Sequence, residues 1–132
     1  MQDNSEQLYF INSLYRDCIL SEILGKDASD ILYWAGKRVS RRYDLSDIDD
    51  LPEFFRIAQF GQLKLISNRR KTVVFELSGQ NVTDRIESSI TEFTIESGII
   101  AECIARENKT NAEAVANIDS KRKVVEIVVQ YD

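Results

Sequence analysis

Hydrophobic positions in the first part of the chain recur at helical spacing. Between residues 8 and 24 they lie three or four residues apart, which predicts a helix with one wide apolar face. Gly25 is expected to end this helix, because glycine readily adopts the left-handed conformation of a helix C-terminus. A second helix is predicted to begin at Asp27, whose side chain would cap it, and to reach residue 43. Residues 52–59 begin with proline and predict a short third helix.

The hydrophobic period changes to two after this helix, which predicts strands. Apolar and polar residues alternate on either side of a polar turn at 68–71, so residues 63–77 form an antiparallel hairpin. A second hairpin is expected over residues 112–131. Between the hairpins, residues 93–108 predict the last helix, and apolar residues at steps of four within 80–90 suggest a shorter one.

This order of elements predicts an α+β fold with a single domain over residues 1–132, of which 1–7 are expected to be flexible. The N-terminal helices and the later glycine-bearing helix would pack on one face of a four-stranded antiparallel sheet made of the two hairpins. The strand at 124–131 is apolar at consecutive positions, which favours burial on both of its faces.

Two glycines interrupt the helical patterns. Gly98 belongs to a stripe of small residues in the last predicted helix, and Gly36 lies inside the second. Glycine in a helix interior costs about 1 kcal/mol relative to alanine. We therefore expect Gly36 and Gly98 to be close-packing positions, where a neighbouring element would clash with a methyl group.

Composition narrows the class of protein. The chain has 132 residues, 43% of them hydrophobic, and a formal net charge of −5, which suits one folded domain with its own core. No apolar run approaches the ~20 residues of a membrane-spanning helix. The polar N-terminus lacks the features of a secretory signal, so a cytoplasmic location is expected.

Missing residue types exclude several kinds of chemistry. The sequence contains no histidine and only two cysteines, Cys18 and Cys103, which excludes Ser-His-Asp catalysis, histidine-bearing zinc sites and proximal-histidine haem. We expect no metal, no cofactor and no catalytic residue, although an enzyme that uses carboxylates or lysine stays open. Each cysteine has apolar neighbours and is either a small buried hydrophobe or a thiol that faces a ligand cavity.

Basic residues cluster in segments 37–42, 69–71 and 121–123. Such clusters can bind nucleic acid. The chain is acidic overall, however, and acidic residues crowd positions 44–53 directly after the first cluster. We therefore interpret the basic segments as solvated surface and expect no nucleic-acid partner.

Several sequence blocks resemble the YslB-like family of small proteins from Gram-positive bacteria, whose domain has no known function. The blocks are ILGKD (23–27), ILYWAGK (31–37), DLPEFF (50–55), FGQL (60–63), FELSG (75–79) and FTIESGIIAE (93–102). The resemblance implies a fold related to the 4-vinyl-reductase-type, haem-NO-associated and Bet-type trafficking (TRAPP) domains. Proteins of that wider group often bind hydrophobic molecules, sometimes through an acylated cysteine, and often form dimers. This chain lacks a haem-ligating histidine, and Val115 and Val125 stand roughly where the vinyl-reductase-type domains have cysteines.

The sequence and the resemblance together favour a module without catalysis that binds a small hydrophobic ligand or a protein partner. A dimeric scaffold without a ligand is the alternative, and an enzyme comes third. The aromatic candidates serve either as core or as pocket lining. The candidate ligand-binding residues are Tyr33, Trp34, Lys37, Phe54, Phe55, Phe60 and Cys103.

A homodimer is the expected oligomeric state. Its interface is predicted to be helical. The residues expected there are Leu14, Tyr15, Cys18, Tyr33 and Trp34. The alternative is edge pairing through strand 124–131, and a monomer that buries all of these residues is also open.

Overall fold

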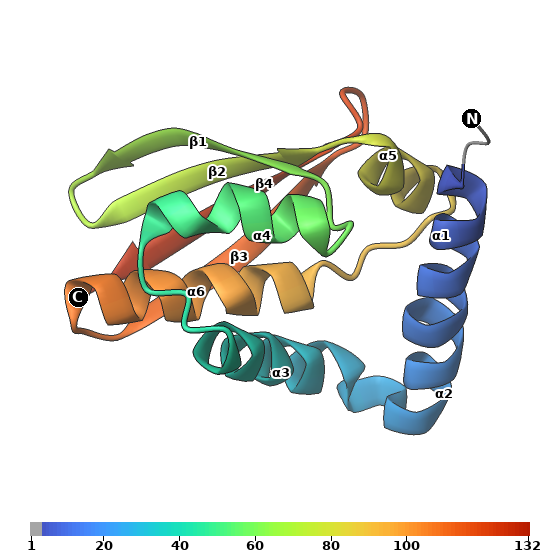
Figure 1. Cartoon of the computed structure of the whole chain (residues 1–132), viewed down its shortest axis with the longest axis horizontal. Coiled ribbons are helices and arrows are strands. Elements are labelled where there is room, and N and C mark those ends of the chain that lie inside the picture. The colour runs from blue at the N-terminus through green and yellow to red at the C-terminus, as the bar shows by residue number, and fades with distance from the viewer. Residues whose placement is uncertain (1–3) are drawn as a thin grey trace.

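The N-terminal third of the protein is helical. The computed structural model describes residues 4–132, and its first helical segment, Ser5–Leu24, stands at one end of the molecule (Figure 1). This segment comprises α1 (Ser5–Asn12), a π-helical stretch η1 (Ser13–Leu20) and α2 (Ser21–Leu24). Residues 1–3 lie outside the described range, whereas residues 5–7, also expected to be flexible, begin α1.

Gly25 separates this segment from the next helix, with φ of +63°. The remaining helices are η2 (Gly25–Asp27), α3 (Ala28–Arg42), η3 (Ile48–Asp50), α4 (Leu51–Ile57), α5 (Gln80–Glu87) and α6 (Thr94–Asn108). They follow the predicted helices closely. Asp27 occupies the N-cap position of α3 as predicted, but its side chain accepts no capping hydrogen bond there.

Four antiparallel strands form one sheet in the order β1-β2-β4-β3. The strands are β1 (Gln62–Arg69), β2 (Thr72–Ser78), β3 (Ala112–Asp119) and β4 (Val124–Tyr131). The two hairpins join where β2 pairs with β4. The predicted α+β architecture is thus confirmed. Because β4 lies inside the sheet, edge-to-edge pairing through residues 124–131 is wrong.

The register also separates the basic hairpin tips. Thr72 pairs with Gln130, and Leu77 pairs with Val125, so the turn after β1 and the turn after β3 lie at opposite ends of the sheet (Figure 1). The basic segments 69–71 and 121–123 therefore do not converge.

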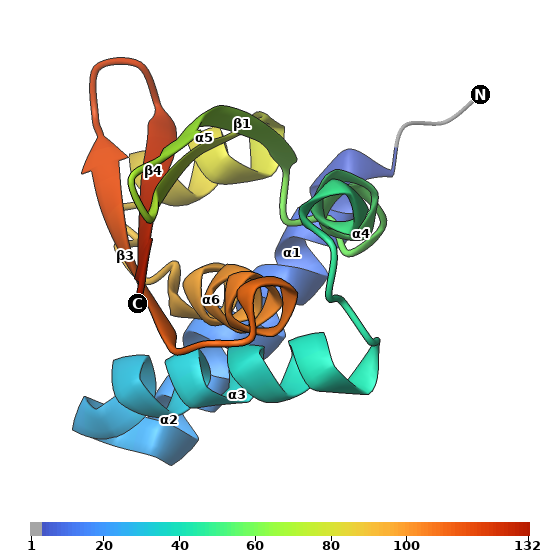
Figure 2. The same cartoon turned by 90° about the vertical axis from the view of Figure 1, so that its left-hand side faces the viewer.

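Helix α6 occupies the middle of the fold. The sheet covers one side of it and α3 lies along the other (Figure 2). Its residues 96–104 are all buried, and Ile100 and Ile104 belong to the same apolar cluster as Phe75 and Ile127 of the sheet. The other face of the sheet is partly open, since Glu126 and Gln130 of β4 are exposed there. The expectation that β4 is buried on both faces is therefore wrong for that face.

Helices α3 and α6 touch backbone to backbone at two glycines. A Cβ atom added to Gly98 would lie 2.1 Å from the carbonyl oxygen of Tyr33, and one added to Gly36 would lie 2.3 Å from that of Ile95. Real Cβ atoms do not approach oxygen this closely. Any side chain at either position would force the helices apart.

Within residues 4–132, no helix is both long and apolar enough to cross a membrane.

Candidate functional site: a pocket beside a buried charge cluster

A pocket of about 150 Å³ lies between the N-terminal helical segment and the body of the protein. Its walls come from the inner side of α1 and η1, the chain just after α4, helix α5 and the start of α6. Most of its surface is apolar. The lining residues are Tyr9, Asn12, Ser13, Tyr15, Arg16, Asp17, Leu20, Ala58, Gln59, Phe60, Asn81, Arg85, Ile95 and Glu96.

The π-helical stretch η1 forms one wall of this pocket. π-helices are rare and are frequently found at functional sites. Here the stretch Ser13–Leu20 turns Arg16 and Asp17 toward the body, although both lie in the middle of an apolar sequence.

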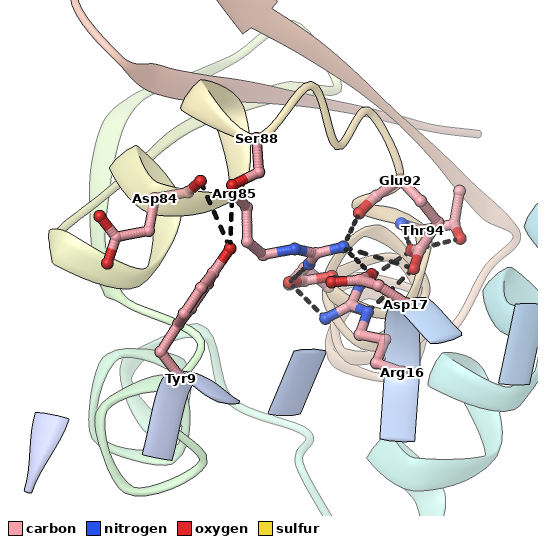
Figure 3. A network of polar contacts seen from close by, with 9 residues as sticks. Tyr9, Arg16, Asp17, Asp84, Arg85, Ser88, Glu92 and Thr94 are labelled. Atoms are coloured by element: carbon pink, nitrogen blue, oxygen red, sulfur yellow. Dashed lines mark hydrogen bonds and ion pairs between the residues drawn. The ribbon is translucent and has the colours of Figure 1, made fainter. Parts of the chain in front are cut away.

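Five charged side chains meet beside the pocket, and we call Arg16, Asp17, Arg85, Glu92 and Glu96 the buried charge cluster. Figure 3 labels the first four of them. Arg16 donates from Nε and Nη2 to the two Glu92 carboxylate oxygens, at 2.9 and 2.8 Å. It also donates from Nη1 and Nη2 to those of Glu96, at 2.9 and 2.6 Å. Only 2% of the Glu96 side chain is exposed. The cluster thus ties the N-terminal helix to the start of α6.

Arg85 of α5 completes the cluster and is less fully paired. Its Nη2 donates to Asp17 Oδ1 at 3.0 Å and to the Glu92 carbonyl oxygen at 2.7 Å. Its guanidinium carbon lies 4.7 Å from the centre of the Phe93 ring. Among the described residues, its buried Nε and Nη1 atoms have no hydrogen-bond acceptor.

The charges in the cluster shift one another's pKa. Burial disfavours the charged form of Arg16, but the attraction and hydrogen bonds of Glu96 and Glu92 outweigh it and raise the Arg16 pKa. Burial and the nearby Arg16 lower the pKa of Arg85. Burial would raise the pKa of Glu92, but its hydrogen bonds with Arg16 and its attraction to that residue prevail and lower it to about 2. The carboxylate of Glu92 also accepts hydrogen bonds from the Thr94 backbone at 2.7 Å and hydroxyl at 2.9 Å.

This lowered pKa predicts a loss of stability in acid. Because the folded-state pKa of Glu92 lies below its ordinary 4.5, its contribution is complete above pH 4.5 and disappears as the pH falls toward 2. We expect Glu92→Gln to lower the free energy of unfolding by on the order of 2–3 kcal/mol at neutral pH. We also expect the stability of this variant to fall less steeply as the pH decreases from 4.5 toward 2. Urea unfolding at about pH 6 and about pH 3 measures both effects. Glu22→Gln, at an exposed glutamate, is the control. If Glu92→Gln lost stability in acid as steeply as the unmodified chain does, the prediction would be contradicted.

The structure does not bring the seven sequence-predicted ligand residues into one site. Phe60 lines the pocket, with its ring centre 5.4 Å from that of Phe55. Phe55 and Cys103 are fully buried in the core, and Phe54 packs on Tyr43, with ring centres 5.3 Å apart. Cys18 is exposed.

The other three predicted residues lie on α3, away from the pocket. Tyr33 donates its hydroxyl to Glu113 of β3 and accepts a hydrogen bond from the Ala114 backbone at 3.0 Å. Lys37 pairs with the same glutamate at 3.0 Å. Burial, and then the hydrogen bond to Glu113, raise the pKa of Tyr33. These two side chains thus fasten α3 to the edge strand β3, while Trp34 remains 60% exposed.

Sequence reasoning missed the buried charge cluster. The signals were present: Arg16 and Asp17 interrupt an apolar helix, and Glu96 falls within one turn of the apolar stripe through Phe93 and Ile100. The spacing of residues could not reveal the pairing itself, because Arg16 and Asp17 pair with residues that lie 68–80 positions away along the chain. Among the described residues, no group of three or more His, Cys, Asp or Glu side chains is arranged to hold a metal ion.

Comparisons with known proteins place these features in a family. Residues 9–130 match the family model described as "Protein of unknown function (DUF2507)". The chain is 32% identical to the uncharacterized protein YslB of Bacillus subtilis (strain 168) over 120 residues, which cover 90% of this chain and 81% of that protein.

Solved structures share the fold at low sequence identity. A vinyl-4-reductase family protein from Methanocaldococcus jannaschii superposes with a TM-score of 0.68 at 17% identity, over 96% of this chain and 81% of the other. A trafficking protein particle complex subunit 3 from Naegleria fowleri, covalently bound to palmitic acid, gives 0.56 at 12% identity, over 98% and 95%. An Fe(II) unliganded H-NOX protein from K. algicida gives 0.53 at 12% identity, over 100% and 75%.

The vinyl-reductase-type, trafficking-subunit and H-NOX likenesses expected from the sequence are therefore confirmed at the level of the fold. The extent of the family match and the identity to the Bacillus relative go further, and together they establish that this chain belongs to the DUF2507 family.

Proposed function

We propose that the protein is a binding module without catalysis, and that it holds a small hydrophobic molecule in the pocket beside η1. The observation that carries this proposal is the pocket itself, with its largely apolar wall and a few polar groups at one side. Ligand sites in proteins commonly have this composition. The titratable groups of the cluster are engaged with one another in ion pairs, which suits holding a ligand rather than transferring protons.

The volume indicates the size of the ligand. A dry cavity of roughly 150 Å³ can hold a benzene-sized molecule, and the pocket has about this volume. Tyr9 and Phe60 offer aromatic surface to such a ligand. We therefore propose a compact, ring-sized ligand instead of an extended acyl chain.

Binding is proposed to be noncovalent. The trafficking subunit of similar fold is described as covalently bound to palmitic acid, whereas neither Cys18 nor Cys103 of this chain lines the pocket. Cys103 is fully buried, and burial, followed by the nearby Glu107, raises its pKa to about 12. A thiol in this environment stays protonated at neutral pH and is a poor nucleophile.

A cavity-filling variant tests the proposal. Native mass spectrometry of protein purified from cells, and titration with benzene, phenol and indole followed by NMR, should detect a bound ring-sized molecule. Ala58→Phe places a ring where Ala58 lines the pocket and should lower affinity more than about 10-fold. Ala28→Phe, at the start of α3 and outside the pocket, should bind as the unmodified chain does. Absence of a co-purified molecule together with no response to the panel would refute ligand binding.

A second candidate is a dimeric scaffold that binds no ligand. It is favoured by the large apolar side chains that the described residues expose, among them Phe10 at 64% and Ile23 at 72%. The ligand experiment separates the two candidates, because a scaffold leaves the pocket to water and Ala58→Phe then changes no binding.

A further inference from the structure

The N-terminal helical segment has a charged side and an apolar side, and the apolar side is the one that faces solvent. Its inner side carries Arg16 and Asp17 to the body of the protein, whereas large apolar side chains point into solvent. We call this surface the outer face. Its large apolar residues are Phe10 (64% exposed), Ile11 (48%), Leu14 (37%), Tyr15 (60%), Ile19 (37%) and Ile23 (72%), and the exposed Cys18 lies among them.

We propose that a second copy of this chain covers the outer face, through two-fold pairing of the N-terminal helices. Large apolar and aromatic side chains present roughly 150–250 Å² each. At the exposed fractions above, the outer face amounts to on the order of 700 Å². A monomeric protein seldom leaves a contiguous apolar patch larger than about 300–600 Å². A standard interface needs about 800 Å² from each partner, so this face supplies most of one.

Charge selects a second copy as the occupant. In a two-fold dimer each surface meets itself, so any charge on it would meet a like charge near the axis. Between residues 8 and 21, Arg16 and Asp17 are the only charged residues, and both are turned inward. The middle of the outer face therefore carries no charge, in a chain whose net charge is −5, and the exposed Glu6 and Glu22 lie toward its two ends. Helices that lie on membranes usually have a polar face rich in Lys and Arg, which this segment lacks.

Pairing would also support the pocket. Figure 1 shows the N-terminal segment with one side toward α5 and α6 and the other side free. Tyr15 belongs to both sides, because it lines the pocket and is 60% exposed. A second copy on the outer face would press this helix against the body. The inference does not require a ligand, and it gives the dimer of the second candidate function a defined interface.

Light scattering at micromolar concentration, with no added ligand, tests the pairing. We expect twice the 15.2 kDa chain mass. Ile11→Glu should raise the dissociation constant more than about 100-fold, because each copy would bury an unpaired carboxylate. Ile23→Glu is a second variant on the same face. The matched control is Ile57→Glu on α4, where the isoleucine is 64% exposed, and this variant should remain dimeric.

Alkylation of Cys18 provides a second measurement. In the dimer the exposed Cys18 thiol should react with maleimide at least about 10-fold more slowly than in Ile11→Glu, because pairing covers it. Cys103 is fully buried and should not react in the folded chain. A monomeric mass for the unmodified chain, or a dimer that survives both face variants with unchanged Cys18 reactivity, would overturn the proposal. Neither result would decide whether a ligand binds, because the Ala58→Phe experiment measures that separately.

Discussion

Gly98→Ala is expected to destabilise the fold by about 3 kcal/mol or more, because its single added methyl group meets backbone. The new Cβ would lie 2.1 Å from the Tyr33 carbonyl oxygen. A backbone oxygen in a helix cannot swing aside as a side chain can, so α3 and α6 must separate along their crossing. Thermal unfolding should show a melting temperature lower by more than about 10 °C.

Gly25→Ala is the control for this prediction. No heavy atom lies within 4 Å of the position that its Cβ would take, although φ is +63°. Its cost is therefore limited to strain in a backbone conformation that L residues rarely adopt (φ +63°, ψ −140°), about 1–3 kcal/mol. If Gly98→Ala were no more destabilising than Gly25→Ala, the close backbone contact between α3 and α6 would be absent.

The fold was largely predictable because each element carries its own periodicity. Residues 93–108 repeat at helical spacing and 124–131 do not, and two hairpins can join into a single sheet in few ways. Periodicity predicts neither the order of the strands in the sheet nor the central position of α6. The small residues around Gly98 indicated close approach of some element, but only the tertiary structure identifies it as α3.

The candidate site was less predictable for a related reason. A hydrophobic stripe says that a helix has two different sides, and the usual inference is that the apolar side faces the core. In the N-terminal segment the opposite holds, since Arg16 is buried and Phe10 is exposed. The sequence pattern also favours aromatic residues such as Trp34 as ligand contacts, whereas in the structure Arg16, Arg85 and Glu96 line the pocket and Trp34 does not. A lone charge within an apolar pattern is the signal that would have identified them.

Glu96→Ala is expected to destabilise the protein by about 3–5 kcal/mol, because it leaves buried positive charge without its partner. Arg16 would lose its hydrogen bonds of 2.9 and 2.6 Å to this carboxylate. Arg85 would lose an ion pair whose atoms lie 3.6 Å apart. Two guanidinium groups would then share Glu92 and Asp17. Urea unfolding at neutral pH measures the loss.

The matched control is Glu53→Ala, which breaks the Arg56–Glu53 pair of 2.6 Å on the surface of α4. Both of its side chains are more than 60% exposed, so water replaces the lost partner and the expected loss is much smaller than that of Glu96→Ala. The double variant Arg16→Met/Glu96→Leu should recover much of the stability that Glu96→Ala loses, because it removes both buried charges together. Equal losses for Glu96→Ala and Glu53→Ala would mean that the cluster is hydrated, and that the N-terminal helix is held to the body by other contacts.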